Sequence, residues 1–165
     1  MAGGDLIRHF TATGFVVRKE CTALHWHRKV EAWLPPGGHI KENEDPVQAV
    51  LREVLEETGI EVEVVPTSPE LNLNYPEQVL PPYTIMVEDI HDPVDGFHKH
   101  IDMIYFCRPT TDSPELAEGW RWVSKDELAD LRPLADGKRP PEVPPDDVRL
   151  LGIRAIEHVT GLPGS

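Results

Sequence analysis

The chain has 165 residues, 39% of them hydrophobic, and its 29 Asp and Glu against 16 Lys and Arg give a formal net charge of -13. This length predicts a single domain over residues 1–165, and no apolar run reaches the roughly 18 residues of a membrane span, so no membrane partner is expected. The acidity argues against broad binding to long nucleic acids but not against small phosphorylated ligands, because a bound divalent cation reverses the local field.

The N-terminal sequence and the cysteine count predict where the protein works. The opening MAGGDLIRHF lacks the basic start and the apolar stretch of a secretory signal. Cys21 and Cys107 are too few for a disulfide framework. Both observations favour a cytoplasmic, reducing environment in which the two thiols stay free.

The pattern of short apolar runs and longer periodic segments predicts a mixed α and β chain. Residues 31–40 hold two prolines and two glycines and are interpreted as an extended loop, and the Pro-rich residues 132–145 are interpreted as an irregular surface connection. Strands are expected at 11–19, 22–29, 61–65, 83–90, 98–108 and 120–123, and helices at 46–58, 125–131 and about 145–160.

The first helix carries the clearest boundary signals. Asp45 is a good N-cap, Pro46 suits the first helical position, and Gly59 suits a left-handed C-terminal cap. At about 100° per residue, one arc of this helix is apolar and three carboxylates project from the other side. The apolar arc consists of Val47, Val50, Leu51, Val54 and Leu55.

The crowding of Glu53, Glu56 and Glu57 calls for a physical reason. Like charges three or four residues apart on a helix repel by roughly 0.2–0.5 kcal/mol per pair. A solvated amphipathic helix is one reading, but this face has no lysine, and the Gly37-Gly38 turn lies only a few residues before the helix. Hard cations such as Mg²⁺ prefer several carboxylate and carbonyl oxygens, so a metal site is the competing reading.

The spacing of these residues carries a family resemblance. From Gly38 the chain reads GHIKENEDPVQAVLREVLEETGI, that is, Gly, five residues, Glu44, seven residues, and then REVLEETGI. This stretch, Gly38 to Ile60, resembles the complete Nudix box of the MutT-type hydrolases. The resemblance implies an α/β fold in which a mixed β-sheet is sandwiched between α-helices. It also implies Mg²⁺- or Mn²⁺-dependent hydrolysis of a nucleoside diphosphate linked to another moiety.

Carried over position by position, the resemblance implies a role for each box residue. The implied metal ligands are Gly38, through its carbonyl, Glu53, Glu56 and Glu57. Arg52 would hold Glu53 by a salt bridge, and Glu44 would support the loop and the helix. Glu53 is a candidate general base for a metal-bound water. In some family members a glutamate ahead of a late strand shares this task, and Glu118 or Glu115 is the candidate, although either could be an ordinary surface acid.

A second polar cluster lies in the longest predicted strand. His98, His100 and Asp102 alternate and therefore share one face of the sheet. We interpret them as a wall of the substrate pocket, since similar patterns occur at this place in some Nudix proteins. A transition-metal site is an alternative, with His25 and His27 as a second alternating pair, and ordinary hydrogen-bonded histidines are the simplest reading.

The substrate is not specified by the sequence. Residues 66–82 and 89–98 are the expected specificity loops, and Trp26, Trp33, Tyr75, Phe97 and Trp120 are candidates for stacking on a base. Subfamilies are sometimes told apart by a Pro or a Tyr after the box, but Tyr75 and Pro76 occur together and are ambiguous between ADP-ribose-type and dinucleotide-type substrates.

Three functions are compatible with the resemblance. An active pyrophosphohydrolase is favoured because every box glutamate is present, and its expected partner is a small nucleoside diphosphate derivative. A homodimer is compatible with this function. A non-catalytic nucleotide sensor would typically have lost some of them. A prenyl diphosphate isomerase would need a catalytic cysteine, and neither Cys21 nor Cys107 has a suitable context.

Overall fold

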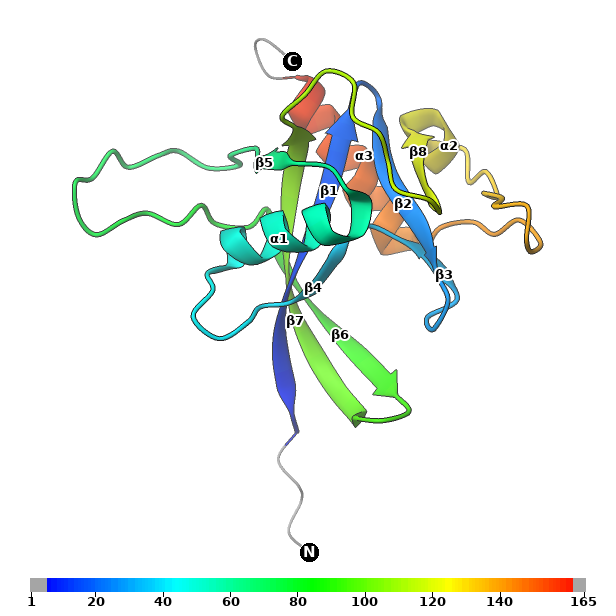
Figure 1. Cartoon of the computed structure of the whole chain (residues 1–165), viewed down its shortest axis with the longest axis horizontal. Helices are drawn as coiled ribbons and strands as arrows, with labels where there is room; N and C mark the ends of the chain where they lie inside the picture. Colours follow the sequence, from blue (N-terminus) through cyan, green and yellow to red (C-terminus); the bar gives the residue numbers. More distant parts are fainter. Residues whose placement is uncertain (1–5, 162–165) are drawn as a thin grey trace, which may run out of the picture.

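One eight-stranded mixed sheet organises the chain in the computed structural model, which describes residues 6–161 (Figure 1). The strands are β1 (Arg8–Arg18), β2 (Cys21–His27), β3 (Ala32–Leu34), β4 (Gly37–His39), β5 (Val62–Val64), β6 (Thr84–Asp92), β7 (Gly96–Pro109) and β8 (Trp120–Ser124). The helices are α1 (Pro46–Thr58), α2 (Lys125–Ala129) and α3 (Asp146–Thr160).

Strand β1 is the centre of the sheet. It runs parallel to β7, with His9 beside His100 and Val16 beside Cys107, and the other strand pairs are antiparallel. The main strand order is β3-β2-β1-β7-β5, while β6 pairs with β7 and β8 pairs with β2. On its other edge β1 changes partner, because Thr11–Thr13 pair with β4 and Val17–Arg18 pair with β2.

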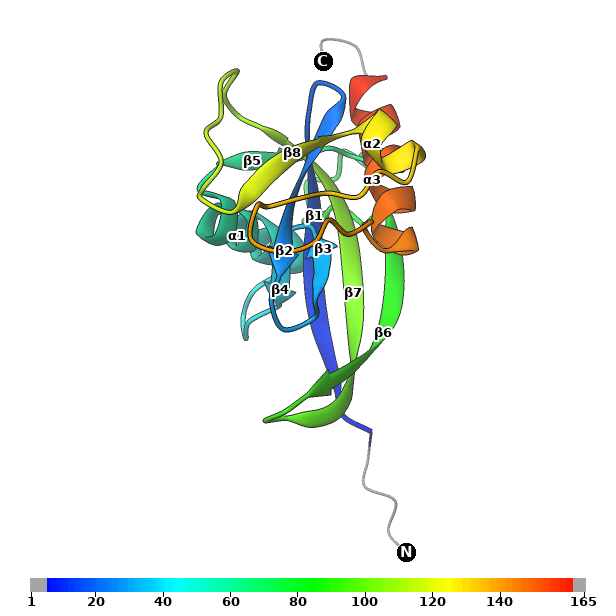
Figure 2. The same ribbon diagram turned by 90° about the vertical axis from the view of Figure 1, so that its right-hand side faces the viewer.

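Helices α1 and α3 lie on opposite sides of this sheet (Figure 2). The apolar side chains divide accordingly into two clusters. One, with Val50, Val54 and Tyr105 at its centre, lies beneath α1, and the other, with Phe15, Leu151 and Ile156, lies beneath α3. The predicted fold class, a mixed sheet between helices, is confirmed.

The boundary signals of α1 are confirmed at both ends. The Asp45 carboxylate accepts a hydrogen bond from the Gln48 amide (2.9 Å), and the Gln48 side chain accepts one from the Asp45 amide (3.0 Å). Gly59 has φ 74° and donates its N–H to the Leu55 carbonyl (3.0 Å). The apolar arc is buried at Val50 and Val54, but Leu55, at its edge, is 44% exposed.

Two predicted loops contain strands instead. Residues 31–40 hold β3 and β4, because Gly37 and Gly38 place their backbone beside Thr13 and Ala12 of β1. Residues 89–98 are mostly the β6–β7 hairpin rather than a loop. The Asp92 carboxylate accepts hydrogen bonds from the amides of Val94 (2.7 Å) and Asp95 (3.1 Å), which closes the tight turn between the two strands.

The remaining predicted elements are confirmed with small shifts. Residues 66–82 carry no helix or strand and extend away from the sheet (Figure 1). Helix α2 ends at Ala129, before Leu131, whose φ is 57°. Residues 132–145 are irregular apart from one bridge between Leu134 and Glu142. No helix between residues 6 and 161 is long and apolar enough to cross a membrane. Cys21 and the buried Cys107 are free thiols.

Candidate active site

Arg52 is the centre of an ion-pair network on α1. Its Nε and Nη2 donate to the two carboxylate oxygens of Glu44 at 2.7 and 2.9 Å, a forked geometry that a lysine cannot reproduce. Its Nη1 donates to Glu53 (2.6 Å) and to Glu56 (3.2 Å). The expected ion pair between Arg52 and Glu53 is therefore present, and one guanidinium fixes three carboxylates.

The network also holds the loop before the helix. The Glu44 carboxylate accepts the Lys41 amide (3.0 Å), and Nη2 of Arg52 donates to the His39 carbonyl (3.1 Å). The hydrogen bonds from Arg52 lower the pKa of Glu44 to about 2, so this carboxylate stays charged at neutral pH. Glu44 thus has the supporting position expected for it.

Gly38 lies directly against the Glu53 carboxylate. A Cβ on Gly38 would lie 2.6 Å from Cδ of Glu53 and 2.7 and 2.8 Å from its two oxygens. Only glycine lets the backbone of β4 approach the helix this closely. The arrangement brings the Gly38 backbone and the carboxylates of α1 into one small region.

The third box glutamate, Glu57, is half-buried. Burial, followed by the nearby charge of Glu53, raises its pKa to about 7, although a hydrogen bond from the Gly37 backbone partly opposes the shift. Carboxylates crowded in this way are destabilising without a counter-charge. The donor set of carboxylate oxygens and a nearby backbone carbonyl is the chemistry that Mg²⁺ and Mn²⁺ prefer, so these residues fit the expected cation.

A cavity of about 550 Å³ opens beside this cluster on the α3 side of the sheet. Gly38 and Glu57 lie in its wall, together with Asp147, Val148 and Leu151 of α3. Its volume lies within the range of small-molecule sites. Glu57 is therefore a box carboxylate that borders a space of ligand size.

The cavity wall is acidic. The carboxylates among its described lining residues are Glu57, Glu88, Asp92, Asp102 and Asp147, whereas Lys29 is the one Lys or Arg among them. Burial, and then the charges of Asp102 and Asp147, raise the pKa of Glu88 to about 7. A phosphorylated ligand in this cavity needs bound cations to offset the repulsion.

The structure separates the three residues of the HKHID motif. Asp102 is buried and accepts hydrogen bonds from Thr11 (2.9 Å) and Thr13 (2.8 Å), and burial raises its pKa. His100 and Asp102 line the cavity, but His98 is 3% exposed and is absent from the described lining. The two histidines instead join His9 and His39, and one ring nitrogen from each of the four lies within 4.8 Å of the others.

Sequence reasoning missed His9 and His39. His9 is close to His100 only because β1 and β7 pair in parallel, and His39 is close because β4 pairs with β1. His39 follows Gly38 of the box directly, and that adjacency was the one available signal. His25 and His27 stay apart from this group; His25 stacks on Trp120 at 4.1 Å, and burial lowers its pKa to about 4.

The stacking candidates and the second general-base candidate do not lie in the described cavity wall. Trp26, Trp33, Tyr75, Phe97 and Trp120 are all absent from it. Glu118 is exposed in the turn before β8, and its neighbour Ala117 donates a hydrogen bond to the Thr58 carbonyl at the end of α1 (2.9 Å). The chain around Glu118 is therefore anchored to the helix that carries the box.

Comparison with models of protein families shows to which family the chain belongs. A model of the NUDIX domain matches residues 8–143, which include the whole sheet and α1. The chain belongs to this family. The expected Nudix membership is confirmed.

Relatives of the chain carry a common name. An RNA pyrophosphohydrolase of Hahella chejuensis is 31% identical over 114 residues, which are 61% of this chain and 66% of the relative. One of Wolbachia pipientis subsp. Culex pipiens is 35% identical over 105 residues, 58% of this chain and 60% of the relative. The chain thus spans slightly less than two thirds of the length of these two Nudix relatives.

Solved structures share the fold. A NUDIX-family hydrolase from Clostridium perfringens has a TM-score of 0.73 and 29% identity, and the match covers 93% of this chain and 99% of that one. The Ap4A hydrolase of C. elegans has a TM-score of 0.57 at 15% identity, with the same coverage, and this likeness concerns the Nudix fold alone.

Proposed function

We propose that this Nudix protein is a divalent-metal-dependent pyrophosphohydrolase that cleaves a nucleoside diphosphate linked to another moiety. One observation carries the proposal: Arg52 binds Glu44, Glu53 and Glu56 together, while Gly38 lies against Glu53 and Glu57 faces the cavity. The Arg52 guanidinium orients carboxylates rather than binding a ligand, and carboxylates held in fixed orientations are what a preorganised cation site requires.

Each box residue has a defined task in this proposal. Mg²⁺ or Mn²⁺ would be held by the Gly38 carbonyl, Glu53, Glu56 and Glu57, and it would offset phosphate charge and lower the pKa of a bound water. Arg52 keeps Glu53 in one orientation. Glu53 is our candidate to accept the proton of the attacking water, with Glu118 as the second candidate.

The acidic cavity favours a small substrate. A long RNA would need a basic path for its phosphates, whereas the described cavity wall offers Lys29 against five carboxylates. We therefore favour a nucleoside triphosphate, a nucleotide sugar or a dinucleotide, bound together with its cations. The name of the relatives makes the 5′ end of an RNA the second candidate.

The test is a substrate panel with Mg²⁺, with Mn²⁺ and with EDTA. The panel contains unmodified and oxidised nucleoside triphosphates, ADP-ribose, diadenosine polyphosphates, coenzyme A, NADH and a 5′-triphosphorylated RNA. We expect turnover of a small compound that EDTA abolishes. Turnover of the RNA alone would contradict the preference for a small substrate, and turnover that persists in EDTA would contradict the metal dependence.

Single substitutions test the assigned residues. Glu56→Gln and Glu57→Gln should each reduce metal-dependent turnover by at least about 100-fold, because each removes a charged metal ligand. Glu57→Gln should also slightly raise stability in metal-free buffer by relieving repulsion, whereas Glu56→Gln loses its ion pair with Arg52 and should gain less. Glu61→Gln, an exposed carboxylate just after α1, is the matched control. Full activity of the Glu56 or Glu57 variant would refute the assigned metal role.

A nucleotide-sensing domain without catalysis is the alternative. It predicts nucleotide binding that calorimetry detects in the absence of any turnover across the panel. The complete set of box glutamates on α1 weighs against it, since binding alone does not need three of them.

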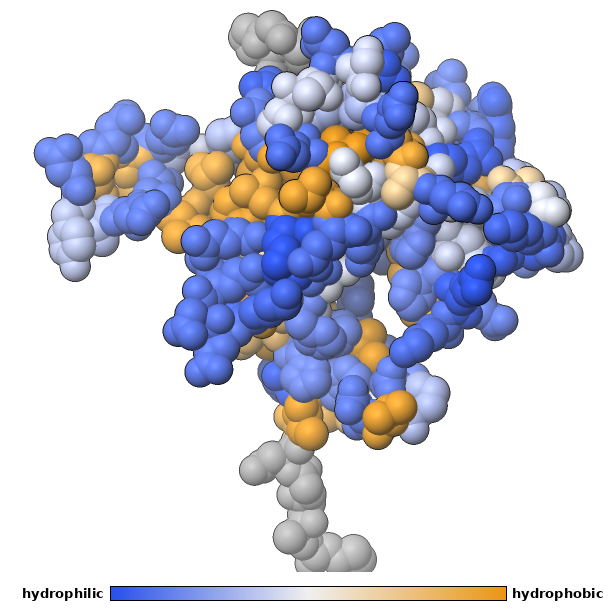
Figure 3. Space-filling view, viewed as in Figure 1, coloured by the Kyte–Doolittle hydropathy of each residue, from blue (hydrophilic) through white to orange (hydrophobic). Residues whose placement is uncertain are grey.

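The cellular location and the assembly remain predictions. The free thiols Cys21 and Cys107 fit a reducing cytoplasm. A homodimer could use the apolar band that Figure 3 shows beside α1; Leu55 of α1, and Leu71 and Val79 of the 66–82 segment, are among the exposed apolar residues. Light scattering on the purified chain measures the assembly directly.

A further inference from the structure

Four imidazoles meet where three strands of the sheet lie side by side. His39 is on β4, His9 is on β1, and His98 and His100 are on β7. The parallel register places His9 directly beside His100, and the antiparallel register places His39 beside Thr11, two residues from His9 on the same face. We propose that these four histidines form a site for Zn²⁺, separate from the glutamates of the box.

The nitrogen positions agree with this occupant. His9 Nδ1 lies 3.2 Å from His39 Nε2, and His98 Nε2 lies 3.2 Å from His100 Nε2. Four nitrogens around Zn²⁺ at about 2.0–2.1 Å lie about 3.3 Å from one another in a tetrahedral site. Two edges of the tetrahedron are thus already formed, and the widest separation, 4.8 Å, has to close by about 1.5 Å.

The buried member of the group has its lone pair directed at the other rings. His98 Nδ1 lies 3.1 Å from the Gly96 carbonyl oxygen, which can only accept, so this nitrogen carries the proton. In the neutral ring Nε2 then presents a lone pair to the cluster, which is the tautomer that outer hydrogen bonds impose on metal-binding histidines. The neutral ring is the form that binds metal.

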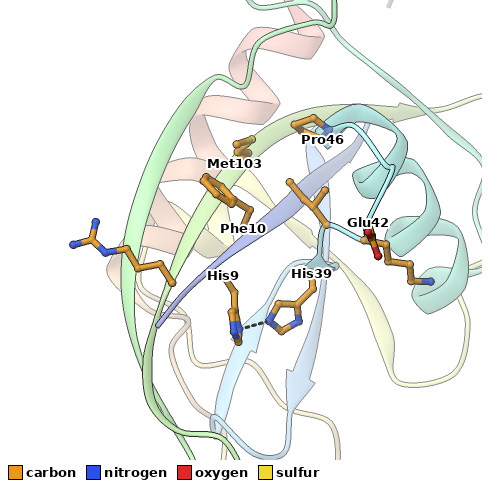
Figure 4. A pocket seen from close by; sticks show the side chains of 9 residues that line it. His9, Phe10, His39, Glu42, Pro46 and Met103 are labelled. Carbon is orange, nitrogen blue, oxygen red and sulfur yellow. Dashed lines mark hydrogen bonds between the residues drawn. The ribbon is translucent and has the colours of Figure 1, made fainter. Parts of the chain in front are cut away.

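The donor type distinguishes this site from the box. Mg²⁺ takes oxygen ligands, whereas imidazole nitrogens prefer Zn²⁺ and related transition metals. The site also has an entry path, because His9 and His39 line a second cavity of about 640 Å³ (Figure 4). One fold would therefore hold two kinds of metal ion, in chemically different surroundings.

An ion here would act as a positioning element. It would tie β4 to β1 and β7 at His39, the residue after Gly38. The carbonyl of His39 accepts a hydrogen bond from Arg52. Gly38 in turn packs on Glu53. Occupancy of the histidine site would thus reduce the motion of β4, the strand that completes the box.

The test measures metal binding directly and needs no substrate. The untagged chain of residues 1–165, stripped with EDTA, is titrated with Zn²⁺ in a large excess of Mg²⁺, which occupies the glutamates. We expect about one Zn²⁺ per chain, a rise in Tm and slower amide exchange in Gly37–His39. No Zn²⁺ binding in the presence of Mg²⁺ would overturn the proposal, whether or not the chain proves to be a hydrolase.

Substitutions locate the ion. His9→Gln and His100→Gln should each weaken Zn²⁺ binding by more than about 100-fold, since even the outer partners of metal ligands are typically worth 10–100-fold. His91 is an exposed histidine of β6 outside the cluster, so His91→Gln should leave the affinity for Zn²⁺ unchanged. Unchanged affinity in the first two variants would refute the site.

A spectroscopic measurement covers the case in which a variant fails to fold. Co²⁺ bound to the unaltered chain should give the intense visible absorption of a four-coordinate, nitrogen-ligated ion. The weak absorption of six-coordinate Co²⁺ would instead overturn the tetrahedral histidine site.

Discussion

Replacing Gly38 by alanine should separate the activity of the protein from its stability. The new Cβ would lie 2.6–2.8 Å from three atoms of the Glu53 carboxylate, whereas ordinary contacts lie at 3.4–4 Å. The carboxylate must therefore withdraw by about 1 Å, and a misplacement of about 1 Å typically costs about 10²-fold in rate. Because the displaced atoms are the end of a flexible side chain, the free energy of unfolding should change little.

Two assays and one control decide the matter. Metal-dependent turnover should fall about 100-fold in Gly38→Ala, and Mn²⁺ affinity, measured by electron paramagnetic resonance, should fall with it. Gly59→Ala is the control, and it should affect stability rather than turnover. Nothing lies within 4 Å of its new Cβ, but its φ of 74° makes alanine strained by about 1 kcal/mol, so stability should fall while turnover holds. A Gly38→Ala protein with full activity, or one that loses mainly stability, would refute the packing argument.

Three further predictions concern the network, the metal and pH. Arg52→Lys should lose about tenfold in turnover, because lysine cannot bind Glu44 through two hydrogen bonds and also Glu53; unchanged kinetics would contradict the network. Removing divalent metal with EDTA should abolish turnover and lower Tm in the parent chain but leave the Tm of Glu56→Gln less affected, as calorimetry would show. His25 has its pKa lowered to about 4 by burial, so the folded state resists protonation and loses stability as pH falls below the ordinary value of about 6.5. Between about pH 7.5 and about pH 5.5 the free energy of unfolding, measured with denaturant, should therefore fall by about 1 kcal/mol more in the parent chain than in His25→Gln. An equal fall in both proteins would show the assignment to be wrong.

The local signals in the sequence were sufficient for α1 and for most strands. Asp45, Pro46 and Gly59 act within a few residues of themselves, so the ends of the helix could be predicted from the sequence. The ion pair between Arg52 and Glu53 was implied by the resemblance to the Nudix box, and the i,i+4 spacing had put Arg52 within reach of Glu56; both contacts are present. The box also indicated that a mixed sheet would lie between helices.

Contacts between distant residues could not be predicted in the same way. His9 and His100 are neighbours through strand register alone, and Asp102 is tied to Thr11 across 91 residues. The hairpin at 89–98 was missed because its turn residues, Asp92 to Gly96, are also typical of loops. Register depends on the whole sheet, so the wall of the cavity and the histidine cluster needed the structure.

The pairing of β1 with β7 also sets the order in which the molecule can form during synthesis. Residues 8–16 find their parallel partners only at residues 99–107, so the emerging box helix has no completed sheet to pack on until about two thirds of the chain has been made. Contacts of such long sequence separation slow folding and leave apolar faces open to other chains in the meantime. The first half of this protein is therefore expected to be the part that most needs protection by chaperones on the ribosome.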